Sequence, residues 1–192
     1  MRYFSAVALA LLAAALVVAP VEAEAGGGQK ILDIDTAAGT ALTNSTTETV
    51  LASHVLPANS LQKFQEYEIA TLVRATATNG TDTLRVRLRI GATTLTGTVV
   101  ADSTAVDVAD NDVVSMRTLC DVRSHGTAGS MVCYVVSTIL GAEGTVTARA
   151  AFEVLTSLDT TAALRIEVTG VWSAASASDS AQSEGFVVIE RT

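Results

Sequence analysis

The sequence is short of the residue types on which several classes of function depend. Its 192 residues include two histidines, only two lysines (Lys30 and Lys63) and 4% aromatic residues, and its formal net charge is −8. Nucleic acid and anionic membrane surfaces bind clustered positive charge, so this balance excludes nucleic acid as an expected partner. The chain also lacks a Gly-rich phosphate loop and a Gly-x-Ser-x-Gly nucleophile motif. We therefore expect no enzymatic activity and no cofactor.

The longest apolar run stands at the N-terminus and has the pattern of an export signal. Arg2 precedes an uninterrupted apolar or small stretch over 4–19, and the segment 23–25 offers the small residues that a signal peptidase reads. Residues 1–25 are therefore predicted to form an apolar signal-like helix that is removed on export. The alternative is a retained membrane anchor, because the 19 uncharged residues over 3–21 approach the ~20 that span a bilayer. Membrane contact is expected only in that second case.

Residues 84–90 show the strongest structural pattern in the chain. Apolar residues alternate there with Arg85, Arg87 and Arg89, and successive side chains of an extended chain point to opposite faces. The stretch is therefore predicted to be a strand with one face on a core and the three arginines on the other. We interpret these arginines as a polar face that meets water, acidic neighbours or the interface with a partner chain.

An Asn-Gly pair at 79–80 directly precedes that stretch. Such a pair is the strongest short-range indication of a β-hairpin, and residues 67–76 are the predicted partner strand. Similar short patterns recur, above all over 164–172, and no helical pattern follows the signal-like segment. The sequence thus predicts an all-β domain of about eight to ten antiparallel strands, either a β-sandwich or a closed barrel. Residues 26–45 are predicted to be a flexible arm with a short strand, and 46–192 the folded domain.

Cys120 and Cys133 form an even pair in a chain with an export-like N-terminus. Folding the chain back about residues 124–129 places Cys120 opposite Cys133 and Val122 opposite Met131, all on one face. A disulfide is then permitted by both the compartment and the geometry. Two reduced cysteines that pack as small apolar side chains fit the same arrangement, so both states remain open.

One turn gathers three carboxylates. Asp107, Asp110 and Asp112 supply the hard oxygen ligands that calcium prefers. The segment lacks the spacing and the closing glutamate of an EF-hand, so a solvated turn is the favoured interpretation and calcium the alternative. His54 and His125 each stand without a second ligand at metal-binding spacing, so no metal site is predicted around them.

Aromatic residues that could stack on a sugar ring are few. Phe64, Tyr67 and Tyr134 are the candidates. Trp172 falls on the apolar face of the strand predicted over 164–172, which favours a place in the core over a place in a binding site. The residues themselves thus indicate a β domain without a recognisable active site.

Three stretches of strand and turn pattern cover most of the chain beyond residue 45. They read TTETVLASHVLPANSL at 46–61, ATNGTDTLRVRLRIGATTL at 77–95 and TTAALRIEVTGVWSAASASDSAQSEGFVVIE at 160–190. They resemble a widespread group of bacteriophage virion jelly-roll proteins, the head-decoration, head-fibre and tail-fibre modules. The resemblance implies a single jelly-roll β-sandwich, commonly a homotrimer, displayed on a capsid or fibre. It carries over no catalytic residue.

From the resemblance we expect a non-enzymatic structural protein of a virion surface that acts in assembly and display. Its expected partners are further copies of itself, capsid or other virion proteins, and a host surface glycan or receptor. The export-like N-terminus departs from that family, because most phage decoration proteins are made in the host cytoplasm. The alternatives are a secreted cell-surface jelly-roll module that binds carbohydrate or a receptor, and an extracellular filament subunit.

Overall fold

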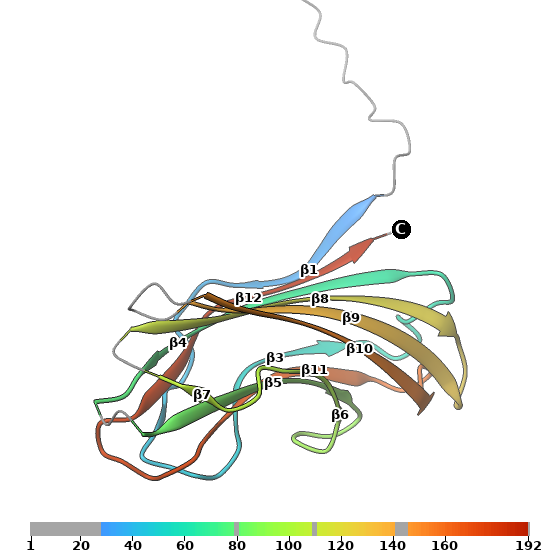
Figure 1. Ribbon diagram of the computed structural model, residues 1–192. Helices are drawn as coiled ribbons and strands as arrows, with labels where there is room; N and C mark the ends of the chain where they lie inside the picture. Colours follow the sequence, from blue (N-terminus) through green and yellow to red (C-terminus); the bar gives the residue numbers. More distant parts are fainter. Residues whose placement is uncertain (1–27, 79–80, 109–110, 141–145, 192) are drawn as a thin grey trace, which may run out of the picture.

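The computed structural model describes residues 28–78, 81–108, 111–140 and 146–191. Within these ranges the chain forms twelve β-strands in two stacked antiparallel sheets (Figure 1). No helix of the described part is long and apolar enough to cross a membrane. The helix predicted for residues 1–25 lies outside the described residues.

The larger sheet has seven strands and forms the upper layer of Figure 1. Two strands from the predicted arm, β1 and β2, belong to it, because both pair with β12. The order from one edge to the other is β1 (Gln29–Asp35), β12 (Ser180–Arg191), β4 (Glu66–Thr76), β8 (Asp112–Ser124), β9 (Gly129–Leu140) and β10 (Val146–Leu158), with β2 (Leu42–Thr43) beside β12.

The smaller sheet has five strands and forms the lower layer. A two-layer antiparallel sandwich is one of the two architectures that the sequence predicts, and it is confirmed. Twelve strands exceed the predicted eight to ten because β2 and β7 have two residues each, and ten strands remain without them. The order is β3 (Thr49–Leu56), β11 (Leu164–Trp172), β5 (Thr83–Gly91) and β6 (Thr98–Asp102), with β7 (Val106–Asp107) beside β5.

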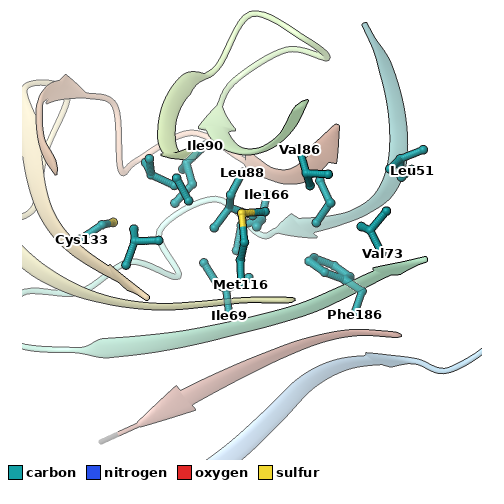
Figure 2. Packing of buried hydrophobic residues seen from close by; sticks show 14 of the residues in the cluster. Leu51, Ile69, Val73, Val86, Leu88, Ile90, Met116, Cys133, Ile166 and Phe186 are labelled. Carbon is teal, nitrogen blue, oxygen red and sulfur yellow. The ribbon is translucent and has the colours of Figure 1, made fainter. Parts of the chain in front are cut away.

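The core fills the space between the two sheets (Figure 2). Met116 of β8 points across it toward Leu88 of β5 and Ile166 of β11. The apolar residues within 84–90 are at most 1% exposed, as their alternation predicts. Burial of each such side chain contributes roughly 1.5–3 kcal/mol to the free energy of unfolding. Trp172, which is 2% exposed, also lies in the core as predicted.

The predicted hairpin between residues 67–76 and 84–90 is wrong. Strand β4 pairs with β12 and β8, whereas β5 pairs with β11 and β6, so the two strands lie in different sheets. Their apolar faces meet the same core from opposite sides. Alternation specifies which face of a strand is buried, but it leaves open which strand lies beside it. The Asn-Gly pair at 79–80 lies outside the described residues.

Strands β8 and β9 form a hairpin in the register that the sequence predicts. Cys120 lies opposite Cys133, and Val122 lies opposite Met131. A disulfide joins the two cysteines, whose Cα atoms are 4.1 Å apart and whose side chains are fully buried. The bond lies on the core side of the larger sheet, so it ties two neighbouring strands together behind the outer face of that sheet.

Candidate functional site

The outer face of the larger sheet exposes more large apolar side chains than any other part of the described chain. A soluble monomer seldom leaves a wide apolar patch uncovered, so this face is a candidate interaction surface. Seven of the ten exposed large hydrophobic residues lie on it: Ile31, Ile34, Leu72, Tyr134, Val136, Phe152 and Val154.

Strands β9 and β10 carry exposed aromatic rings on this face. Tyr134 of β9 lies directly opposite Phe152 of β10, and Val132 lies opposite Val154. We call these four residues the aromatic platform. The neighbouring Cys133 is buried, so the two-residue period of the strand turns Tyr134 outward. Tyr134 is 49% exposed and Phe152 64%.

The platform rests on a supported part of the sheet. Residues directly opposite each other on one sheet face have Cβ atoms about 4.5–5.5 Å apart, so the two rings stand side by side. Leu119 of β8 continues the apolar surface on the other side of Tyr134. The Cys120–Cys133 disulfide lies on the opposite face of these same strands. The β9 half of the platform is therefore backed by a covalent cross-link to β8.

An ion cluster borders the platform on β4 and β8. Glu68 lies opposite Leu119, is 8% exposed, and accepts hydrogen bonds from Arg117 and Arg191. Burial raises the pKa of Glu68, but the hydrogen bond from Arg117 and the charge of Arg191 outweigh burial and bring the pKa below its ordinary value. The carboxylate is therefore ionised at neutral pH, and the exposed side of the Arg117 guanidinium remains open to solvent.

A second ion pair borders the platform at its other end. Asp121 lies opposite Val132, and its carboxylate accepts a hydrogen bond of 3.1 Å from Arg123. Both charged side chains are about half exposed, at 47% for Asp121 and 59% for Arg123. Donors and acceptors for a ligand's hydroxyl groups thus lie next to the apolar rings.

A second apolar area lies beyond the ion cluster, on β1 and β12. Ile31 and Ile34 of β1 are opposite Ile189 and Val187 of β12, and these four residues form what we call the β1 area. The two β1 residues are about three-fifths exposed. This area has only aliphatic side chains, which suit another apolar protein surface better than a planar ligand.

The predicted arginine stripe lies on the outer face of the smaller sheet. Arg85 pairs with Asp102 at 2.5 Å, and Arg87 reaches both Asp102 and Glu48. Arg89 donates to both carboxylate oxygens of Glu48, at 2.8 and 2.9 Å. All three guanidinium groups are thus paired with acidic neighbours inside the chain. An interface role for Arg85, Arg87 and Arg89 stays a prediction.

Glu48 is the centre of that arginine network. It stands directly before β3, and it also accepts a hydrogen bond of 2.6 Å from Thr169 of β11. Burial raises the pKa of Glu48, but hydrogen bonds from Arg89 and Thr169 and the charges of Arg89 and Arg87 lower it to about 2. Sequence reasoning missed Glu48, because an acid in a loop has no periodicity. Only the pairing of β3 and β5 with β11 brings it to the arginines.

A cleft of about 280 Å³ opens between β1, β3 and β12. His54 lines it, and its Nδ1 lies 3.0 Å from Oδ2 of Asp33, so this histidine has a carboxylate partner that its sequence neighbours do not reveal. Ser60 also lines the cleft, but its hydroxyl is buried and has no hydrogen-bond partner. His54 therefore makes no hydrogen bond to the Ser60 hydroxyl, and a hydrolytic site needs such a bond between base and nucleophile.

The predicted acidic turn is dispersed. Asp107 is exposed at the end of β7, Asp112 is buried at the start of β8, and Asp110 lies outside the described residues. Among the side chains that the structure describes, no group of three or more histidines, cysteines, aspartates or glutamates is placed to hold a metal ion. For Asp107, Asp110 and Asp112, the solvated turn stays the prediction and calcium binding stays its alternative.

Of the predicted stacking residues, only Tyr134 belongs to the platform. Tyr67 is buried, and its hydroxyl donates to a backbone carbonyl at 2.9 Å. Phe64 is exposed in the loop before β4, where the ammonium of Lys63 lies 4.6 Å from the centre of its ring. Sequence reasoning missed Phe152, because residues on both faces of β10 are exposed around it and the strand shows no alternation there.

Comparison with known proteins gives likenesses of architecture only. No protein-family model and no curated protein matches this chain. A seed lectin of Lotus tetragonolobus is similar in structure, with 9% identity and a TM-score of 0.38 over 76% of this chain and 79% of the lectin. The CBM2 module of the evolved Dit protein of Lactobacillus casei BL23 phage J-1 is similar too, with 17% identity and a TM-score of 0.30 over 71% of this chain and 67% of that one. Likenesses this distant concern the β-sandwich arrangement and assign no ligand.

Proposed function

We propose that this protein is a non-enzymatic module that binds carbohydrate through the aromatic platform. The observation that carries the proposal is the exposed pair of rings, Tyr134 and Phe152, side by side on neighbouring strands. A pyranose ring presents C–H groups on one face, and these pack against the face of an aromatic ring. Two adjacent rings offer places for two successive sugar units.

The charged groups beside the platform supply the polar half of such a site. The hydroxyl groups at the rim of a sugar need donors and acceptors. Arg117, Asp121 and Arg123 present both kinds on the same sheet face. The surface is a sheet face and not a deep pocket, so an extended glycan chain suits it better than a single buried sugar.

The setting that we propose is the outside of a cell or the surface of a virion. The export-like N-terminus supports the first, and the resemblance to virion jelly-roll proteins supports the second. In either setting a glycan of a cell surface is the expected ligand. The jelly-roll connectivity and the homotrimer implied by the resemblance belong to the same proposal.

The test is glycan-array screening of the purified protein, followed by calorimetric titration with the strongest ligand. Replacement of Tyr134 or Phe152 by alanine is expected to weaken binding by roughly tenfold or more, since about 1.4 kcal/mol of lost stacking corresponds to that factor. Phe64→Ala is the matched control, because it removes an exposed aromatic ring outside the platform, and it is expected to leave the Kd unchanged.

Two outcomes would overturn the proposal. One is a folded protein that binds no glycan on a broad array. The other is a glycan whose affinity falls equally in Phe64→Ala and in the platform variants, because binding would then not depend on the paired rings.

A second candidate function is structural assembly, and the exposed β1 area favours it. Ile31 and Ile34 lie on an edge strand, where a further chain can cover both the side chains and the unpaired backbone groups. Self-association through this edge fits a virion-surface protein that acts in assembly and display, with capsid or other virion proteins as further partners. An extracellular filament subunit would use the same edge repeatedly.

Light scattering on a sizing column tests this second candidate. A trimer that dissociates in the double variant Ile31→Ser, Ile34→Ser supports assembly and display. Growth into polymers as the concentration rises supports a filament subunit. A monomer at every concentration contradicts both.

A further inference from the structure

Two buried carboxylates meet at one end of the sandwich, away from both outer faces. Asp82 stands directly before β5, and Asp179 stands directly before β12. The residues directly before and at the start of β5 lie beside the β11–β12 connection, at the left end of Figure 1. Thr83 and Ser173 tie these two segments together, because the Thr83 amide donates to the Ser173 hydroxyl and the Ser173 amide donates to the Thr83 carbonyl, both at 2.9 Å.

Both carboxylates are almost entirely removed from solvent, and neither has a basic partner among the described side chains. Asp82 is 3% exposed and Asp179 is 1% exposed. Both side-chain oxygens of Asp179 and Oδ2 of Asp82 are buried without a hydrogen-bond partner. No ion pair within the described residues includes either carboxylate. Three buried oxygen atoms without a hydrogen-bond donor thus belong to two carboxyl groups that are close enough to interact.

Such an arrangement is unfavourable unless something else compensates the charge. Moving a single ionised carboxylate out of water costs several kcal/mol when no partner replaces its hydration. A second carboxylate beside it adds repulsion. Burial and the charge of Asp82 accordingly raise the pKa of Asp179 above its ordinary value. Either a shared proton or a bound cation can relieve the pair.

We propose that Asp82 and Asp179 form a binding site for a divalent cation of the calcium class. A single shared proton satisfies two oxygen atoms and leaves the third without a partner, whereas a cation can accept more than two oxygen ligands. The hydroxyls of Ser176 and Ser178, 2.8 Å apart, lie in the same connection as Asp179. These four side chains offer oxygen ligands, which a hard cation such as Ca²⁺ prefers.

The site also gives the two connections a structural role. The β4–β5 connection passes from the larger sheet to the smaller, and the β11–β12 connection passes back. A cation held by one carboxylate from each would clamp the two sheets together at this end. Asp107 pairs with Thr83 in the backbone, so this residue lies at the same end of the sandwich, but it is not needed for the site.

The experiment is calcium titration of the purified full-length protein after treatment with EGTA. We expect Ca²⁺ to bind with a stoichiometry near one and to raise Tm by several degrees, because a ligand that binds only the folded state stabilises it. Asp179→Asn and Asp82→Asn are expected to abolish the heat of binding and the rise in Tm. Asp107→Asn, an exposed acid at the same end, is the matched control and should keep both.

The stability of the variant without metal distinguishes a bound cation from a shared proton. Without calcium, Asp179→Asn is expected to be at least as stable as the EGTA-treated protein, because it removes the repulsion between the carboxylates. If the Tm of the wild-type protein does not change with calcium but rises as the pH falls toward 5, the proposal is overturned in favour of a shared proton. Calcium binding that persists in Asp179→Asn overturns it as well. If a variant fails to fold, the titration of the wild-type protein alone decides whether a calcium site exists.

Discussion

The two outer faces of the sandwich are built by the same alternation but present opposite chemistry. On the smaller sheet, the residues that alternate with the core are arginines, and each is paired with Glu48 or Asp102. On the larger sheet, the outward residues include Tyr134 and Phe152, which nothing in the described chain covers. The charges of the first face are paired inside the chain, whereas the rings of the second face are exposed.

This contrast shows that a side chain can point away from the core and still be unavailable to a ligand. A strand's period decides which side chains leave the core. Whether they are free for a ligand depends on what neighbouring strands and loops bring beside them. Glu48, from a loop, neutralises a stripe that looked like an interface in the sequence. Among the residues that the structure describes, none covers the rings of the platform in a comparable way.

The largest expected effect comes from breaking the satisfied face with Arg87→Glu. From the sequence alone, this change should weaken self-association and keep the fold. In the structure, however, the new carboxylate would stand between Glu48 and Asp102. We therefore expect a loss of about 3–5 kcal/mol in the free energy of unfolding, the usual result of an uncompensated half-buried charge.

Urea unfolding measures the effect of Arg87→Glu. Arg74→Glu is the control, because the Arg74–Glu184 pair is exposed on the larger sheet and such pairs contribute only about 0–1 kcal/mol. Equal losses of unfolding free energy in the two variants would show that the arginine network contributes no more to stability than an exposed ion pair.

The next largest effect is expected from the disulfide behind the platform. The double variant Cys120→Ala, Cys133→Ala opens a bridge that spans 13 residues, and a loop of this size corresponds to about 3 kcal/mol. Hydrogen exchange should accelerate in β8 and β9 more than in β5 and β11. A uniform acceleration of exchange in both sheets would contradict a local role of the disulfide. As a control, a reducing agent should have no further effect on the stability of the variant.

A smaller effect is expected when acid breaks the Glu48 network. The folded pKa of Glu48 is about 2, below its ordinary 4.5, so its stabilising contribution is present above pH 4.5 and is lost as the pH falls toward 2. Glu48→Gln should cost roughly 2 kcal/mol at neutral pH. The difference in stability between the wild-type protein and this variant should shrink on acidification, and a difference that stays constant from pH 6 to pH 2 would contradict the assignment.

The smallest effect on stability is expected on the unsatisfied face. Tyr134→Ser and Phe152→Ser remove exposed side chains, so the free energy of unfolding should change by no more than about 0.5 kcal/mol. Carbohydrate binding, in contrast, should weaken by roughly tenfold or more in each variant. Thermal unfolding and glycan titration of the same samples measure the two properties together. A large fall in Tm would show that the rings stabilise the fold instead of serving a ligand.

Much of the fold could be predicted from local patterns. The strand over 84–90 and the register of Cys120 with Cys133 depend on alternation and on one turn, and both appear as expected. The hairpin expected at 79–80 failed for a physical reason: β4 and β5 present their apolar faces to one core from opposite sheets. Pairing across 100 or more residues, as between β4 and β12, has no local sign in a single sequence.

The candidate sites were harder to predict because they are assembled from distant segments. Tyr134 was recognised as a stacking candidate, but its partner Phe152 lies on an edge strand without alternation. Asp82 and Asp179 lie 97 positions apart, in two connections that only the packing of the sheets brings together. No spacing rule finds such a pair.

The sequence by itself determined that the folded domain is all-β, which residues of its strongest strands are buried, and that two cysteines face each other. These properties follow from side-chain alternation and short turns, which act between near neighbours. The tertiary structure alone decided that the arginines are neutralised by Glu48, that two rings form a platform, and that two carboxylates are buried together. Those features depend on which strands become neighbours, and the burial of one shared core by two sheets settles that choice.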